Sequence, residues 1–101
     1  MCGIAGYIGN RDIDLAAVRS CLALMCRRGP DSSGYYRHVD TRGNNVLLLS
    51  TRLKIIDLDD KANQPFSAGP DVIVYNGELY NYVELRRVLK GKGVNFRTAS
   101  D

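Results

Sequence analysis

Histidine is almost missing from this chain of 101 residues, since His38 is the only one. Enzymes that use a cysteine nucleophile usually activate it with a histidine base. His38 lies in a strand-like stretch, where a surface position is the favoured interpretation, so a Cys–His dyad has little support. A zinc site is equally weak, because Cys2, Cys21 and Cys26 would need a distant histidine as their fourth ligand. We therefore expect no metal.

Long hydrophobic runs and a strong excess of one charge are also absent. The longest apolar run, "NVLLLS", has the length of a strand, so no membrane interaction is expected. The N-terminus lacks the basic and apolar regions of a secretory signal, which favours a cytoplasmic location with reduced cysteines. The net charge is only +3, from 14 Lys and Arg against 11 Asp and Glu. Without a basic stripe interleaved with aromatic residues, nucleic acid is not an expected partner.

The patterns that are present indicate one α+β domain. Strand patterns cover residues 2–8, 35–39, 46–58 (one long strand or a pair), 71–75 and the start of a further strand at 94–96. Helical periodicity covers residues 12–28 and 80–90. The expected apolar face of the first helix consists of Ile13, Ala16, Ala17, Ser20, Cys21, Leu24 and Met25. That of the second consists of Tyr82, Leu85 and Leu89.

Cys2 directly follows Met1. Removal of Met1 would give Cys2 a free α-amino group. Such amines have a reference pKa of about 7.7–8.0, against about 8.5 for a thiol, so both reactive forms are available near neutral pH. The amine is tethered close to the sulfur, and orienting it costs little. From position alone two interpretations stay open: a nucleophile activated by its own amine, or a small residue at the start of a strand.

Six motifs occur in a fixed order: "MCGIAGYIG", "RRGPDSSG", "TRLKIIDL", "QPF", "YNGELYNYVELR" and "FRTASD". Together they closely resemble the N-terminal glutaminase domain of glutamine-hydrolysing asparagine synthetases. That domain is a class II glutamine amidotransferase of the N-terminal-nucleophile hydrolase superfamily. The resemblance covers residues 1–101. It implies a four-layer αββα sandwich, in which two antiparallel sheets pack face to face between helices.

The resemblance implies that Cys2 attacks the side-chain amide of L-glutamine and releases ammonia through a glutamyl thioester. The oxyanion formed in this attack needs preorganised donors. By resemblance these are the side-chain amide of Asn76 and the backbone N–H of Gly77. A lone Asn-Gly pair more often forms a hairpin turn. The helical periodicity after Gly77 argues against a hairpin here.

The resemblance also implies how free glutamine is held. Arg52 matches the arginine that binds the α-carboxylate, a role that suits a guanidinium. The alternative is a solvent-facing strand residue. Glu78 and Asp101 match the acids that bind the α-ammonium group. The residues expected to line the substrate are Leu53, Lys54, Ile55 and Ile56.

Asparagine synthetases also need a C-terminal ATP-pyrophosphatase domain, which adenylates aspartate and accepts the ammonia. The stretch "GKGVN" lacks the spacing of a phosphate-binding loop. ATP and Mg²⁺ are therefore expected in a domain outside residues 1–101, with no cofactor inside them. The resemblance implies a glutaminase domain cut short after Asp101, inactive alone or limited to glutamine hydrolysis. Exposed sheet edges and apolar faces would favour marginal stability or a homo-oligomer.

Three positions depart from the family pattern. Arg27 stands where the family often has histidine, and Leu49 and Ser50 stand where it commonly has Gly-His. These departures bear on the shape of the pocket and on catalytic competence. Two alternative functions stay open: the glutaminase domain of another class II amidotransferase with a different ammonia acceptor, and a non-catalytic fragment that keeps the fold. "RGPD" followed by "RLKIIDL" fits the asparagine synthetase pattern better than the patterns of purine or amino-sugar synthesis.

Overall fold

A computed structural model describes all of residues 1–101. The elements in chain order are β1 (Gly3–Gly9), α1 (Leu15–Met25), β2 (Ser32–Val39), β3 (Asn45–Arg52), the 3-10 turn η1 (Asp60–Ala62), β4 (Phe66–Ala68), β5 (Asp71–Ile73) and α2 (Tyr82–Gly91). All paired strands are antiparallel. The predicted α+β class is confirmed.

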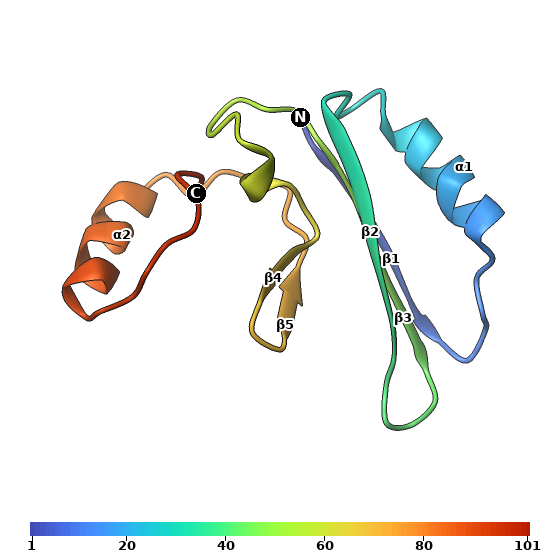
Figure 1. The fold of residues 1–101 in the computed structure, drawn as a ribbon. Coiled ribbons are helices and arrows are strands. Elements are labelled where there is room, and N and C mark those ends of the chain that lie inside the picture. The colour runs from blue at the N-terminus through green and yellow to red at the C-terminus, as the bar shows by residue number, and fades with distance from the viewer.

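The first sheet has the order β1–β3–β2, so β3 is its central strand. Gly3 pairs with Thr51, and Ser32 pairs with Arg52. The start of β1 and the start of β2 therefore both lie beside the C-terminal end of β3. Helix α1 runs along one face of this sheet (Figure 1). This arrangement gathers three separate chain segments at one end of the sheet.

The core of the molecule lies between α1 and the first sheet. Val18 of α1 and Leu47 and Leu49 of β3 are its buried apolar residues. The partly buried residues around them are Ala5, Tyr7, Ile13, Cys21, Leu22 and Met25. The interpretation of Cys21 as a small core residue is confirmed by its place in this cluster.

The predicted apolar face of the first helix is partly wrong. Ile13, Cys21 and Met25 do pack on the core, but the helix presents Val18 and Leu22 to the sheet as well. The residues predicted to be buried that are exposed instead are Ala16, Ala17, Ser20 and Leu24. Branched side chains bury more apolar surface than alanine or serine, which favours the observed rotation of the helix.

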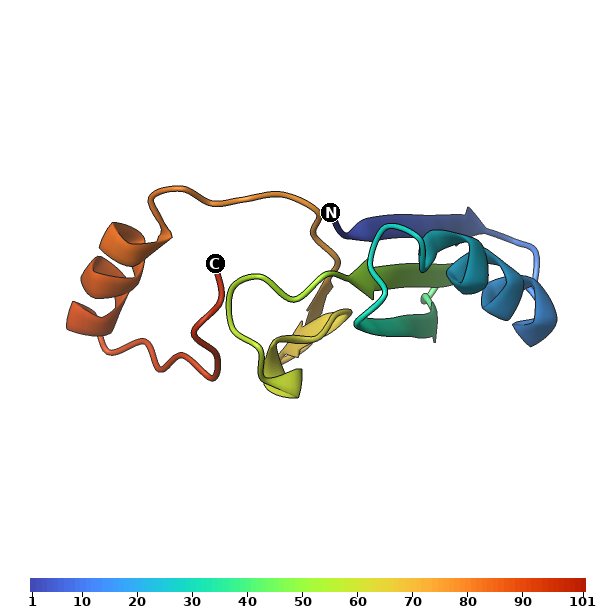
Figure 2. The same ribbon diagram turned by 90° about the horizontal axis from the view of Figure 1, so that it is seen from above.

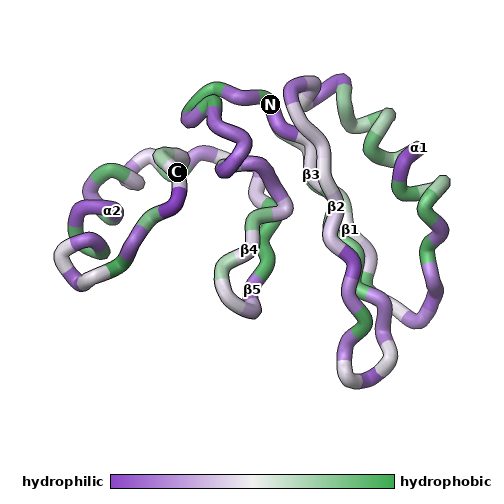
Figure 3. Tube along the Cα trace, in the orientation of Figure 1, coloured by the Kyte–Doolittle hydropathy of each residue, from purple (hydrophilic) through white to green (hydrophobic).

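The remaining elements form a second, more open region. Strands β4 and β5 make a two-stranded ribbon, and both views show it between the first sheet and α2 (Figures 1 and 2). No residue of α2 is buried. Its predicted apolar face borders an open cavity of about 460 Å³, together with Phe66 and Ile73 of the ribbon. Figure 3 shows hydrophobic colouring along part of β5, which lies away from the sheet that α1 covers.

The overall shape is less compact than that of a typical domain of this size. The radius of gyration is 15.1 Å, whereas a compact domain of 100 residues has about 13 Å. The predicted packing of two sheets in a four-layer sandwich stays a prediction. None of the helices is both long enough and apolar enough to cross a membrane.

Two strand predictions are wrong. The stretch 46–58 does not continue as a strand or a strand pair, because β3 ends at Arg52. Asp57 adopts a left-handed backbone with φ 55°, which an extended strand cannot accommodate. Residues 94–96 form no strand and follow a turn after α2. In contrast, β2 begins at Ser32, three residues before the strand expected from "YYRHV".

Candidate functional site

Cys2 lies directly before β1 and is half-buried. Its Sγ lies 3.9 Å from the carbonyl oxygen of Leu53, a distance typical of a weak S–H···O contact. Arg28 donates a hydrogen bond from Nε to the carbonyl oxygen of Cys2 at 3.1 Å. The thiol expected to be the nucleophile is therefore held beside the first residue of the expected substrate-lining segment.

The "RGPD" motif supports the same end of the sheet. Gly29 is buried against β3, and a Cβ atom there would lie 2.5 Å from the backbone nitrogen of Arg52. Only glycine allows this approach. Asp31 donates from its backbone N–H to the carbonyl of Arg52 at 3.0 Å, and its Oδ2 accepts from the backbone N–H of Lys54 at 2.8 Å. The motif thus fixes where β3 ends.

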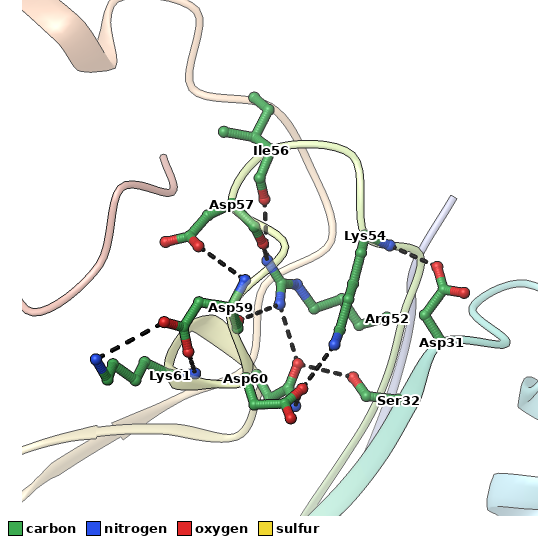
Figure 4. A network of polar contacts seen from close by, with 10 residues as sticks. Asp31, Ser32, Arg52, Lys54, Ile56, Asp57, Asp59, Asp60 and Lys61 are labelled. Atoms are coloured by element: carbon green, nitrogen blue, oxygen red, sulfur yellow. Dashed lines mark hydrogen bonds and ion pairs between the residues drawn. The ribbon is translucent and has the colours of Figure 1, made fainter.

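Arg52 is buried, with 6% of its surface exposed. Its Nη1 donates to the carbonyl of Asp59 at 3.2 Å and to Oδ1 of Asn63 at 3.0 Å. Its Nη2 donates to the carbonyls of Ile56, at 3.0 Å, and Asp57. Figure 4 shows the guanidinium enclosed by the loop of residues 56–63 that carries these partners. The alternative of a solvent-facing Arg52 is wrong.

The loop after Arg52 carries the other expected substrate-lining residues. Leu53, Lys54 and Ile56 are half-buried, and Ile55 is exposed. Lys54 Nζ lies 2.6 Å from Oδ1 of Asp60, and this hydrogen bond is the main reason that the pKa of the Asp60 carboxyl lies below its ordinary value. The Lys54 side chain therefore points toward Asp60.

The second group of expected site residues lies between β5 and α2. Asn76, Gly77 and Glu78 are exposed there, in a stretch that leads into a helix, so the hairpin alternative is wrong. Asp101 is half-buried, and its Oδ2 accepts from the backbone N–H of Leu79 at 2.8 Å. This bond brings Asp101 next to the segment that carries Glu78.

Asp57 links the two groups. Its Oδ2 accepts from the backbone N–H of Ala99 at 2.6 Å, and its Oδ1 accepts from that of Asp59 at 3.0 Å. The bond from Ala99, followed by that from Asp59, lowers the pKa of the Asp57 carboxyl. No hydrogen bond joins Asn76 or Gly77 to Cys2. The bond between Asp57 and Ala99 ties the loop that contains Arg52's partners to the C-terminal segment.

Several supporting residues were not predicted as functional from the sequence. They are Arg28, Gly29, Asp31 and Asp57. All four stand inside motifs that carry the resemblance, "RRGPDSSG" and "TRLKIIDL". That membership was the only signal, because their contacts reach backbone atoms far away in the sequence.

The departures from the family pattern fall at different depths. Arg27 is exposed, Leu49 packs in the core, and Ser50 is buried on β3. His38 is exposed on β2, which confirms its interpretation as a surface strand residue.

A family model described as a glutamine amidotransferase domain matches residues 1–101. The chain is 35% identical over 108 residues to asparagine synthetase [glutamine-hydrolyzing] 1 of Bacillus subtilis, which it covers to 16%. It is 39% identical over 116 residues to a putative asparagine synthetase [glutamine-hydrolyzing] of Mycobacterium tuberculosis, of which it covers 18%. It is 40% identical over 105 residues to the asparagine synthetase [glutamine-hydrolyzing] of Brassica oleracea, of which it covers 17%. All of this chain is aligned in each case, so it spans less than a fifth of these relatives. No solved structure matches significantly.

Proposed function

Because the chain belongs to the glutamine amidotransferase domain family, we propose that it hydrolyses L-glutamine with Cys2 as its nucleophile. The ammonia released would serve the amidation of aspartate to asparagine. One observation carries the proposal: the half-buried Cys2 thiol lies at the carbonyl of Leu53, and Arg28 binds the backbone carbonyl of Cys2. These contacts place the thiol beside the expected substrate-lining segment.

The proposed chemistry begins when Met1 is removed. The amine of Cys2 takes the thiol proton, and the sulfur bonds to the carbon of the glutamine side-chain amide. The C–N bond then breaks, and the amine returns the proton to the leaving ammonia. Water hydrolyses the thioester, which gives glutamate and restores the thiol. With Met1 attached, the same nitrogen belongs to an amide and cannot act as the base.

We assign the oxyanion donors to the side-chain amide of Asn76 and the backbone N–H of Gly77. Two backbone or amide donors in preorganised positions are the usual requirement for this intermediate. We assign Glu78 and Asp101 to the α-ammonium group. The bond from Leu79 to Asp101 supports this pairing, because it holds the second acid next to the first.

Arg52 has a more demanding role in the proposal. Both of its terminal nitrogens donate to this chain itself, so a bidentate contact with a substrate carboxylate requires an exchange of partners. We propose that the substrate carboxylate replaces the carbonyls of Ile56 and Asp57 on Nη2 and also accepts from Nε, which makes no hydrogen bond within the chain. Leu53, Lys54, Ile55 and Ile56 would then close over the substrate as the loop shifts.

The lengths of the relatives lead us to propose a longer protein. In it a C-terminal synthetase domain uses ATP and Mg²⁺, and this glutaminase domain is completed to the four-layer sandwich. The residues present here do not fit ATP: Gly91 is the last residue of α2 and Gly93 follows the helix, whereas a phosphate-binding loop precedes a helix. Nor do any three His, Cys, Asp or Glu side chains form a group that could hold a metal ion.

We further propose a cytoplasmic location, which agrees with three free cysteines. Self-association is proposed from the apolar residues that α2 leaves exposed, such as Leu85 and Val88. In the longer protein, we propose that the remainder of the glutaminase domain covers this face instead.

Labelling with a diazoketone analogue of glutamine tests the nucleophile. We expect the analogue to modify Cys2 in chain from which Met1 has been removed, with the site read by peptide mass spectrometry. Chain that keeps Met1 should react about 100-fold more slowly, because the base is lost. Cys2→Ala should abolish labelling, whereas the control Cys26→Ala should leave it unchanged. Modification of Cys26 with Cys2 untouched would refute the assignment.

The sequence that follows residue 101 tests the ammonia acceptor. An ATP-pyrophosphatase domain is expected there. A phosphoribosyltransferase or sugar-isomerase domain would instead assign the chain to another class II amidotransferase. In the longer protein, glutamine hydrolysis that survives Cys2→Ala undiminished would rule out the proposed mechanism.

A further inference from the structure

The C-terminal segment 97–101 has no helix or strand of its own. It is nevertheless ordered by side chains from elsewhere in the chain. Arg86 of α2 donates from Nη1 to the carbonyl of Thr98 and from Nη2 to the carbonyl of Ser100, both at 2.6 Å. The guanidinium also lies over the ring of Phe96, 4.4 Å from its centre. A single side chain thus holds the segment at two carbonyls and also contacts Phe96 directly before it.

The direction of these bonds shows how the segment is held. The carbonyls of Thr98 and Ser100 accept from Arg86, and the N–H of Ala99 between them donates to Asp57. The segment bends at Arg97 and Ala99, so its course is set by these side-chain contacts and not by pairing with a strand.

Asp101 follows immediately after the second of these carbonyls. Its Oδ1 accepts from the hydroxyl of Ser100 at 3.3 Å, and its Oδ2 from the N–H of Leu79 at 2.8 Å. The position of the carboxylate therefore depends on where the backbone of Ser100 lies. Because a guanidinium binds two acceptors in a fixed planar geometry, Arg86 fixes that backbone more strictly than a lysine could.

We propose that Arg86 is a positioning residue for Asp101, setting where this carboxylate meets the α-ammonium group of the amino-acid substrate. This inference rests on the proposed function. The neighbouring Arg87 is exposed and makes no hydrogen bond or ion pair, so it provides a matched control on the same helix. Loss of Arg86 should weaken recognition of the ammonium group while the Cys2 thiol keeps its intrinsic reactivity.

Two diazoketone probes separate recognition from reactivity: the glutamine analogue and the same molecule without its α-amino group. We expect the wild-type chain without Met1 to label Cys2 faster with the amino probe. Arg86→Gln should reduce that preference about 10-fold, as expected for loss of one well-placed charged contact. Arg86→Lys should retain part of it, and Arg87→Gln all of it. Labelling by iodoacetamide should be equal in all four chains.

A double-mutant cycle with Asp101→Asn tests whether Arg86 acts through Asp101. The double variant should lose no more preference than Asp101→Asn alone. Equal loss with both probes in Arg86→Gln, or fully additive losses in the cycle, would overturn the inference and indicate a general structural role. If Arg86→Gln keeps the wild-type preference, the inference also fails, while the proposed function stands. If the wild-type chain labels Cys2 with neither probe, the proposed function fails instead, and the positioning role falls with it.

Discussion

Of the nine buried residues, eight lie in residues 1–52, and only Ala62 lies in residues 53–101. The first region is held by the ladder of β1, β3 and β2 and by the packing of α1 on that sheet. The second is held mainly by side chains that bind distant backbone atoms. The most stable segments of a protein are those with buried contacts. The comparison indicates a rigid platform for Cys2 and a tethered frame for Asn76–Glu78 and Asp101.

The second region is tied by three arginines and one aspartate. Arg52 and Asp57 fix the loop after β3, and Arg86 fixes the C-terminal segment. Arg97 lies over Phe66 and donates to the carbonyl of Ser67. Loops tied in this way can be loosened by changing one charge, whereas the first region responds to changes in packing.

The largest effect is expected in the core of the first region. Leu49→Ala should lower the free energy of unfolding by about 3 kcal/mol, because a buried leucine leaves a cavity against Val18 when it is shortened. Urea unfolding followed by circular dichroism measures this. Leu24→Ala is the control, since Leu24 is 76% exposed. Similar losses in both variants would contradict a core confined to the α1–sheet interface.

Gly29→Ala should have the next largest effect, about 2 kcal/mol, because the added Cβ meets the backbone of Thr51 and Arg52 rather than a flexible side chain. Unfolding of this variant by heat should begin at a lower temperature. Gly91→Ala is the control: its Cβ would meet no atom within 4 Å, and alanine in a helix is about 1 kcal/mol better than glycine. A neutral Gly29→Ala would show that β3 can move away at Arg52.

The sequence allowed the first region to be predicted better than the second, and the reason is physical. A short apolar run predicts β1, and helical periodicity predicts α1, because local chain geometry decides both. The rotation of α1 was not predicted, because Ala17 and Val18 are adjacent on the helix and only packing against the sheet decides which of them is buried. The end of β3 was missed because it depends on contacts from other segments: Gly29 and Asp31 contact its last residue, Arg52, whose side chain in turn binds carbonyls four to seven residues later.

The candidate site shows the same limit. The resemblance named Cys2, Arg52 and Asp101, but it gave no contacts for them. Arg52 binds carbonyls of this chain, and Arg86 and Asp57 hold the segment before Asp101. These contacts join side chains to backbone atoms in other parts of the chain. No periodicity in the sequence encodes such contacts.

Arg52→Lys should loosen the second region and spare the first. Lysine carries a point charge and cannot serve four acceptors at once, so the loop should lose about 1–2 kcal/mol of local stability. Hydrogen exchange read by mass spectrometry should become faster in residues 56–63 and stay unchanged in residues 45–51. Arg42→Lys is the control, since Arg42 is exposed in the turn before β3.

The same variant tests the exchange of partners proposed for Arg52. In the longer protein, we expect a raised KM for glutamine, with ammonia-dependent synthesis spared. Equal loss of both activities would indicate a role in folding alone. Faster exchange that spreads into β3 would show that the two regions are not held separately.

The smallest expected effect is the response of the Asp57 tether to acid. The N–H groups of Ala99 and Asp59 lower the pKa of the Asp57 carboxyl, with a further contribution from the Arg52 guanidinium. A carboxyl with a lowered pKa in the folded state stabilises that state above its unfolded pKa of about 4, and the contribution is lost as the pH falls through the lowered value. The backbone amide of Ala99 should therefore titrate in an NMR series below pH 4, and Asp57→Asn should abolish that titration.

Asp40→Asn is the matched control. The Asp40 carboxyl also has a lowered pKa, caused first by the side chain of Asn44, but it lies in the turn before β3. It should alter the amides of Arg42 and Asn44 and leave Ala99 unchanged. An Ala99 amide that still titrates in Asp57→Asn would show that another group ties the C-terminal segment to the loop after β3.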